Sequence, residues 1–112
     1  MSTGNAVIAL VQITDRPLDV AAHEAAVRNP AAGAVVVFQG SVRNHDHGRG
    51  VVKLDYEGHP DAVRVLREVA EEIAADPEVL ALAVSHRVGA MEIGDIAIVA
   101  AVATAHRGAA FA

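Results

Sequence analysis

Arginine and histidine side chains stand just after the most apolar stretches of this chain, and both types suit the binding of a small anion. A guanidinium group binds phosphate or carboxylate through paired N–H donors, and imidazole can donate a hydrogen bond or carry a proton near neutral pH. If the apolar stretches are buried strands that end at one edge of a sheet, they would gather these side chains into a local anion site. The pairs that follow three apolar runs are Arg43 with His45, His86 with Arg87, and His106 with Arg107.

The same residues are also compatible with a solvated loop or a metal site. The segment from Gly40 to Gly50 contains two arginines and two histidines, a composition that an ordinary solvated loop also shows. His45, His47 and His59 could suggest a zinc site, but no fourth ligand at a fixed spacing is implied, and we expect no metal. A single His-Arg pair at a strand end often only reaches solvent, so the anion site rests on the recurrence of the pairs.

The composition predicts one domain over residues 1–112 with a core of aliphatic side chains. Of the 112 residues, 53% are hydrophobic but only 3% are aromatic, so Val, Ile, Leu and Ala must fill the core. Such a core gains little from large rings, and we expect an oligomer to complete it. The absence of cysteine excludes disulfides, thiolate metal sites and cysteine nucleophiles.

Charge and hydropathy argue against two classes of partner. Nine Lys and Arg against fourteen Asp and Glu, without aromatic residues among the basic ones, argue against nucleic-acid binding. The longest wholly apolar stretch, 96–103, is too short to span a bilayer, and the N-terminus lacks the pattern of a secretory leader. We therefore expect a cytoplasmic protein that binds neither nucleic acid nor membrane.

Hydrophobic periodicity and turn residues indicate an α+β domain with a largely antiparallel sheet and flanking helices. The segment 33–43 is apolar on both faces, which favours a central strand. Strands are expected at 6–13, 33–43, 51–57, 79–88 and 95–105, helices at 19–28 and 60–75, an unfinished helix at 108–112, and a mobile loop at 45–50. The apolar stripe of the second helix is expected to comprise Val63, Leu66, Val69, Ala70 and Ile73.

Four blocks of the sequence resemble the large, catalytic subunit of molybdopterin synthase, in the family's order and approximate spacing. The resemblance extends over about residues 5–112 and is specific because separated blocks agree. The blocks are GAVVVFQGSVRNH at 33–45, LDYEGHP at 54–60, HRVG at 86–89, and GD with AHR at 94–95 and 105–107.

This resemblance implies an α/β-hammerhead fold and a homodimer in which each large subunit binds a small ubiquitin-like subunit, giving a heterotetramer. The thiocarboxylate at the C-terminus of the small subunit would enter a pocket of the large subunit and donate sulfur. Two such donations would convert cyclic pyranopterin monophosphate into the dithiolene of molybdopterin. The resemblance thus implies a sulfurtransferase of molybdenum cofactor biosynthesis with no cofactor of its own.

The resemblance also implies roles for particular residues. Arg43 would contact the incoming thiocarboxylate or the substrate and is the expected catalytic residue. His106 and Arg107 would hold the anionic group of the substrate, from the same or the neighbouring protomer. Phe38 matches an aromatic residue beside the pocket. His45, His86 and Arg87 match positions of the family's motifs, but the resemblance assigns them no definite role.

One departure from the family concerns lysine. The family continues with a helix and a lysine-bearing stretch that would supply acid–base and electrostatic groups, whereas Lys53 is the only lysine of this chain. We therefore expect the chain to be a C-terminally truncated version of a longer protein. The alternative is a non-catalytic module that binds the ubiquitin-like partner or a pterin phosphate.

Overall fold

Strands form two sheets, with three helices beside them, in the part of the chain that the structure describes. That part of the computed structural model comprises residues 6–43, 51–54 and 62–111. The predicted loop at 45–50, the end of the strand expected at 51–57 and the start of the helix expected at 60–75 lie outside it. None of the described helices is long and apolar enough to cross a bilayer. In chain order the elements are β1 (Val7–Thr14), α1 (Val20–Ala26), β2 (Ala34–Ser41), β3 (Val51–Leu54), α2 (Ala62–Ala74), β4 (Val79–Arg87), β5 (Gly89–Glu92), β6 (Ile96–Thr104) and α3 (Arg107–Phe111).

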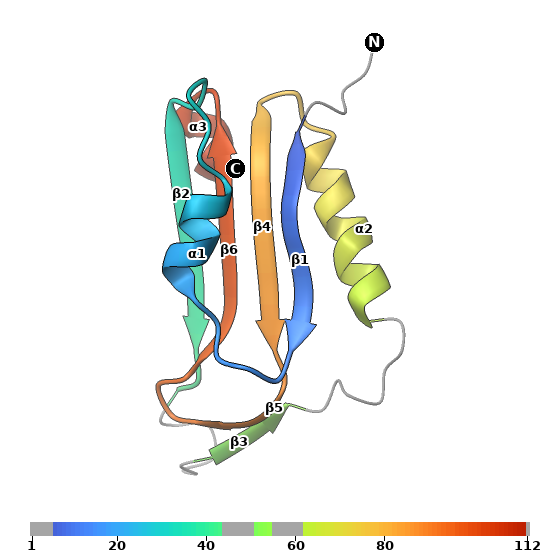
Figure 1. The fold of residues 1–112 in the computed structure, drawn as a ribbon, viewed down its shortest axis with the longest axis vertical. Helices are drawn as coiled ribbons and strands as arrows, with labels where there is room; N and C mark the ends of the chain where they lie inside the picture. Colours follow the sequence, from blue (N-terminus) through green and yellow to red (C-terminus); the bar gives the residue numbers. More distant parts are fainter. Residues whose placement is uncertain (1–5, 44–50, 55–61, 112) are drawn as a thin grey trace.

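The main sheet has the strand order β1-β4-β6-β2 and is largely antiparallel (Figure 1). β6 pairs antiparallel with both β4 and β2, whereas β1 pairs parallel with β4. β3 and β5 form a separate antiparallel pair beyond one end of the main sheet. The predicted α+β class with a largely antiparallel sheet is therefore confirmed.

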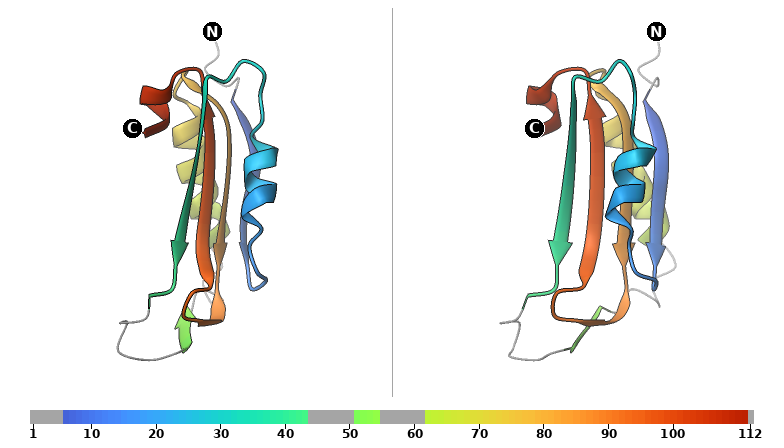
Figure 2. Two further views of the ribbon diagram at one scale, coloured as in Figure 1. Left: turned by 90° about the vertical axis from the view of Figure 1, so that its left-hand side faces the viewer. Right: turned by 60° about the vertical axis from the view of Figure 1, so that its left-hand side comes forward.

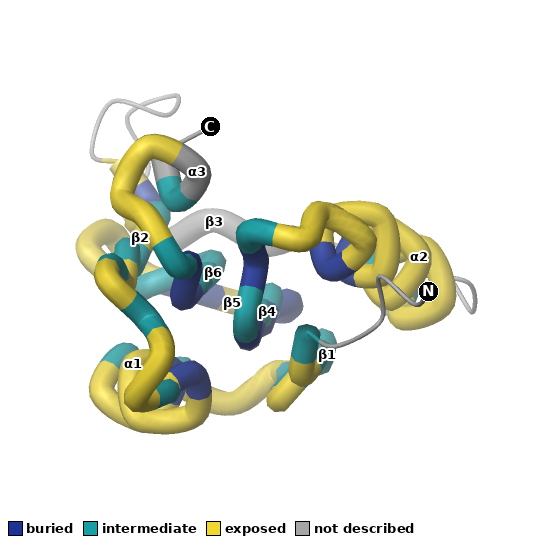
Figure 3. Tube along the Cα trace, turned by 90° about the horizontal axis from the view of Figure 1, so that it is seen from above, coloured by how far each residue is buried: buried dark blue, intermediate teal, exposed yellow. Residues whose placement is uncertain are grey.

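Helices lie on both faces of the main sheet, α1 on one face and α2 with α3 on the other (Figures 2 and 3). Beneath α1, Val27 packs with alanines of β4 and β6, and Ala70 and Ala74 of α2 pack with side chains of β4. These small side chains let helix and sheet approach closely. Apart from Met91 the buried hydrophobic residues of the described part are aliphatic, as the composition predicts, and comprise Val27, Val42, Ala70, Ala74, Val79, Ala81, Leu82, Ala83, Val88, Met91, Val99, Ala101 and Ala103.

The strand that the sequence predicts as central lies at an edge of the sheet. β2 is the last strand in the order and has β6 as its neighbour. Its two apolar faces have a different cause, because α1 lies on one side of the sheet near β2 and α3 on the other (Figure 3). Apolar residues on both faces of a strand indicate that helices lie over both faces of the sheet. They do not indicate whether the strand has one neighbouring strand or two. Val35 and Phe38 of this edge strand stay 42% and 57% exposed.

β5 is a strand that the sequence pattern does not predict. It pairs with β3, and its buried residues Gly89 and Met91 alternate with exposed Ala90 and Glu92. Four residues are too few for a period of two to stand out in a sequence. The glycines that mark this connection do turn the chain, since Gly89 and Gly94 have φ angles of 93° and 94°, which only glycine adopts without strain.

The apolar stripe predicted on the second helix is wider than the contact that α2 makes. Ala70 and Ala74 are buried, whereas Val63, Val69 and Ile73 are 47%, 46% and 44% exposed. The smallest side chains of α2 face the sheet, so the larger apolar ones flank the contact instead of filling it. The predicted stripe is therefore only partly buried against the sheet.

A buried polar pair connects α1 to the sheet. His23 and Ser85 are only 2% and 0% exposed. His23 Nδ1 lies 2.6 Å from the carbonyl oxygen of Asp19, and its Nε2 lies 2.6 Å from Ser85 Oγ. Because a carbonyl oxygen only accepts, Nδ1 is the donor, and in the neutral ring Nε2 accepts the hydroxyl proton of Ser85. The pair fixes α1 beside the strand that ends in His86 and Arg87.

We predict that Ser85→Ala lowers the free energy of unfolding by about 1–3 kcal/mol, because His23 Nε2 would be left buried without a partner. Urea denaturation measures this loss. The matched control is Ser41→Ala, at an exposed position at the end of β2, which should change stability by less than about 0.5 kcal/mol. Equal stability of the two variants would contradict the structural role of the His23–Ser85 pair.

Candidate functional site

The described members of the predicted arginine and histidine pairs lie at two opposite ends of the main sheet, Arg43, His86 and Arg87 at one and His106 with Arg107 at the other. β2 and β4 both run antiparallel to β6, so the residues that follow β2 and β4 lie together, and those that follow β6 lie at the other end. β6 has nine residues, which corresponds to roughly 26 Å between the two ends. The expectation that all the pairs meet at one edge is therefore wrong within a single chain.

Arg43 lies at the first end, against the turn between β5 and β6. The N–H of Val42 donates to the carbonyl of Asp95 over 2.9 Å, and the N–H of Gly94 donates to the carbonyl of Val42 over 2.9 Å. The positive φ of Gly94 lets the turn present its N–H in this way. These bonds hold the backbone next to Arg43, while the Arg43 side chain is exposed. An exposed guanidinium on a fixed backbone can bind an anion from solvent.

Arg87 lies at the same end but is already engaged. Its Nη1 is 3.5 Å from Asp95 Oδ2, and its side chain is only 16% exposed. The same carboxylate oxygen accepts the N–H of Glu92 over 2.9 Å. Arg87 Nε is buried and has no hydrogen-bond partner within the described ranges. Arg87 thus helps to hold the β5–β6 turn, and Arg43 is the more accessible cation.

His86 is half-buried beside Arg87, near the end of β4. Neighbouring residues on a strand face opposite sides, so His86 points away from the face on which Ser85 contacts α1. Desolvation by this burial lowers the pKa of His86 below its ordinary value of 6.5. The half-buried ring favours a neutral imidazole, which fits a structural or hydrogen-bonding role better than that of a cation.

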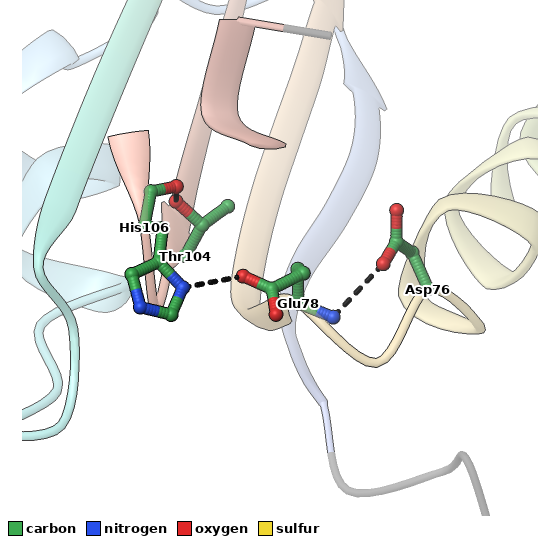
Figure 4. A network of polar contacts seen from close by, with 4 residues as sticks. All are labelled: Asp76, Glu78, Thr104 and His106. Carbon is green, nitrogen blue, oxygen red and sulfur yellow. Dashed lines mark hydrogen bonds and ion pairs between the residues drawn. The ribbon is translucent and has the colours of Figure 1, made fainter. Parts of the chain in front are cut away.

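His106 (Figure 4) and Arg107 lie at the second end, after β6. His106 Nδ1 is 2.9 Å from Glu78 Oε1, and its side chain is 81% exposed. Thr104 Oγ1 donates to the carbonyl of His106 over 2.6 Å. Arg107 is exposed and is the first residue of α3. Together they form a second exposed basic group, separate from Arg43.

Phe38 lines an apolar groove between α2 and α3. The groove has a volume of about 430 Å³ and is floored by β2, β4 and β6. Phe38 is 57% exposed there. The place beside the family's pocket that the resemblance implies for Phe38 stays a prediction. The other lining residues are Val36, Leu66, Val69, Ala70, Glu72, Ile73, Asp76, Val79, Leu82, Ala83, Val84, Ala100, Ala101, Val102 and Ala110.

Two acidic residues of this arrangement are absent from the predicted site residues, although Asp95 belongs to the GD block at 94–95. Asp95 holds Arg87, and Glu78 holds His106 from 28 positions away along the chain. Neither contact follows from spacing, because each joins elements that only the sheet brings together. His45 lies outside the described residues. Among those residues that are described, no group of three His, Cys, Asp or Glu side chains could hold a metal ion.

We predict that folding stability falls with acidification through the titration of His86. Since the folded pKa is below 6.5, the unfolded chain takes up this proton first as the pH is lowered, which favours unfolding between the two pKa values. His86→Gln should therefore show a shallower loss of stability than the unmodified chain between about pH 7.5 and pH 5.5. Urea denaturation across this range measures it. The same slope in both proteins would contradict the lowered pKa.

Comparison with known proteins gives consistent matches. The family model described as MoaE protein matches residues 13–112. Molybdopterin synthase catalytic subunit 1 of Mycobacterium tuberculosis is 40% identical over 101 residues, which cover 89% of this chain and 69% of that protein. The molybdopterin synthase catalytic subunit of Bacillus subtilis is 37% identical over 101 residues, covering 89% of this chain and 64% of that protein.

Solved structures show the same similarity. The molybdopterin biosynthesis MoaE protein of Burkholderia ambifaria superposes with a TM-score of 0.75 at 32% identity, covering 92% of this chain and 69% of that one. A chain of the complex of subunits 1 and 2 of molybdopterin-converting factor from Helicobacter pylori has a TM-score of 0.63 at 26% identity, covering 95% and 70%.

This chain spans 50% to 74% of the length of such curated relatives. The family model nevertheless extends from β1 to the end of the chain, across both ends of the main sheet. The chain therefore belongs to the MoaE family, whose curated members are molybdopterin synthase catalytic subunits.

Proposed function

We propose that this chain is the sulfur-accepting, catalytic part of a molybdopterin synthase. The small ubiquitin-like subunit would donate sulfur from its C-terminal thiocarboxylate, and cyclic pyranopterin monophosphate would receive it in two steps that build the dithiolene. Membership in the MoaE family supports this reaction. We assign the reaction to particular residues on one observation. Two exposed basic groups, Arg43 and His106 with Arg107, stand on a chain of net charge −5.

Both reactants carry an anion that these groups suit. The thiocarboxylate is itself an anion and becomes a carboxylate when its sulfur is transferred and water supplies the oxygen that replaces it, and the precursor carries a phosphate. Arginine binds either group with two N–H donors, and such charge-assisted bonds are stronger than neutral ones. Arg43 would contact the thiocarboxylate or the reacting part of the precursor, and His106 with Arg107 would bind the precursor's anionic group. Phe38 would line the pocket, while Arg87 and His86 would support the Arg43 end.

A homodimer would bring the two basic groups to one substrate. Within one chain they lie at opposite ends of β6, roughly 26 Å apart, which is too far for one small molecule to bridge. A second copy in an antiparallel arrangement would place its His106 and Arg107 beside the Arg43 of the first. A ubiquitin-like subunit on each copy would complete a heterotetramer, and the complex of subunits 1 and 2 from Helicobacter pylori supports such a partner. A cytoplasmic location stays a prediction from the sequence.

We predict that Arg43→Ala slows dithiolene formation on the order of 10²-fold, because a charged donor at the reacting centre would be lost. Single-turnover conversion of the precursor by the complex with thiocarboxylated small subunit measures this rate. Arg28→Ala, at an exposed arginine after α1, is the matched control and should keep the unmodified rate. Unchanged turnover in Arg43→Ala would contradict the role of Arg43.

The shared site can be tested by mixing variants. Arg43→Ala chains and Arg107→Ala chains should each be impaired, but a mixture forms hybrid dimers in which one site has both arginines. Random pairing makes half of the dimers hybrid, each with one intact site of two, so about a quarter of the unmodified activity should return. The Arg43→Ala chain mixed with itself is the control. Failure of the mixture to exceed the single variants would contradict a site made by two chains.

A further inference from the structure

We propose that Glu78 is a positioning residue that fixes the ring of His106 so that Nε2 is the nitrogen presented to an anionic ligand. This inference rests on the proposed function, in which His106 binds the anionic group of the precursor. Glu78 is distinct from the residues named above as substrate contacts, and it reaches His106 only through the fold (Figure 4).

The contact fixes which ring nitrogen carries the proton. Glu78 Oε1 lies 2.9 Å from His106 Nδ1. A carboxylate oxygen accepts and does not donate, so Nδ1 carries the hydrogen of this bond. Nε2 is the nitrogen on the other side of the ring. In the protonated ring it carries an N–H that can donate to an anion, whereas in the neutral ring with its hydrogen on Nδ1 it can only accept. In a histidine that binds a ligand, the hydrogen bond at one nitrogen sets the state of the other in this way.

The backbones that carry the two side chains are joined to each other. The N–H of Ala105 donates to the carbonyl of Glu78 over 3.1 Å. The N–H of Glu78 donates in turn to Asp76 Oδ1 over 2.8 Å, which holds the turn before β4. Ala105, which precedes His106, is therefore hydrogen-bonded to the backbone of Glu78. The two side chains that meet are thus carried by backbone segments that are held together.

The buried residue Thr104 holds the backbone of His106 in place. Thr104 is fully buried, and its hydroxyl donates to the carbonyl of His106 over 2.6 Å. The backbone before β2 closes the same region, because a Cβ atom at Gly33 would lie only 2.4 Å from the carbonyl oxygen of Ala105. The ring is thus exposed at its tip but held at its base, as expected of a ligand-binding side chain.

The contact between Glu78 and His106 adds little to folding stability. The side chains of His106 and Glu78 are 81% and 44% exposed, and ion pairs at such exposed positions contribute little to folding. The contact between Glu78 and His106 is explained better by ligand binding than by folding stability. A ring that is already oriented loses less conformational freedom when a ligand binds. Arg107 follows directly at the start of α3, so the fixed ring and a guanidinium stand side by side in the sequence.

The state of the ring can be read directly by ¹⁵N NMR of histidine-labelled protein. In the neutral form of the His106 ring, the unmodified chain should show the hydrogen on Nδ1. Glu78→Gln retains an oxygen that accepts from Nδ1 and should keep this form, whereas Glu78→Ala should shift the ring toward the Nε2–H form that free imidazole of histidine prefers. Glu68→Ala, at another exposed carboxylate, is the matched control and should change nothing. An unchanged ring in Glu78→Ala would overturn the inference.

Affinity for the precursor supplies the second readout. Titration calorimetry with cyclic pyranopterin monophosphate should show a dissociation constant roughly two- to tenfold higher for Glu78→Ala, and rescue in Glu78→Gln. If His106→Ala weakens binding but Glu78→Ala does not, the inference is overturned while the proposed function stands. If His106→Ala leaves binding unchanged, the proposed role of His106 fails, and the NMR result alone decides whether Glu78 positions the ring.

Discussion

The antiparallel pairing of β6 with both of its neighbours is the constraint on which the arrangement of this molecule depends. Since β2 and β4 both run against β6, the turns that follow them share one end of the sheet. Arg43, His86 and Arg87 are thereby collected on one side, and His106 with Arg107 is carried to the other. A strand of nine residues separates them by more than a small substrate can span. The direction of β6 thus divides the basic residues expected at one anion site into two separate groups.

In each of these two groups, one basic side chain contacts an acidic residue from a neighbouring turn. Asp95 holds Arg87 and also accepts the N–H of Glu92, so the same carboxylate shapes the turn against which Arg43 lies. Glu78 holds His106 at the other end. Two carboxylates of this acidic chain therefore act locally, since Asp95 engages the Arg87 guanidinium and Glu78 contacts one nitrogen of the His106 ring. Arginine in a family motif is not by itself a free cation, as Arg87 shows.

The small side chains of the core shape the surface near Phe38. Ala70 and Ala74 bring α2 close to β4, and this leaves the larger Val69 and Ile73 beside the contact. These side chains line the groove that Phe38 borders between α2 and α3. A core of alanine and valine packs densely but covers little area per residue, so apolar surface is left on the same face. The low aromatic content therefore also helps to explain the exposed groove, because few large side chains are present to cover this face.

The sequence by itself determined the class of fold, the strands and helices of strong periodicity, and the residues whose chemistry suits anions, because burial patterns and side-chain chemistry are local. It also determined the family, through blocks such as that around Arg43. It did not determine that β2 is an edge strand, since an apolar run reports cover by helices and not pairing by strands. It missed β5, because four residues show no clear period. Only the tertiary structure decided which basic residues meet, and that Glu78 and Asp95 hold two of them. The directions of the strands and the contacts between distant turns determine which of these side chains lie together. Neither can be predicted from the spacing of residues along the chain.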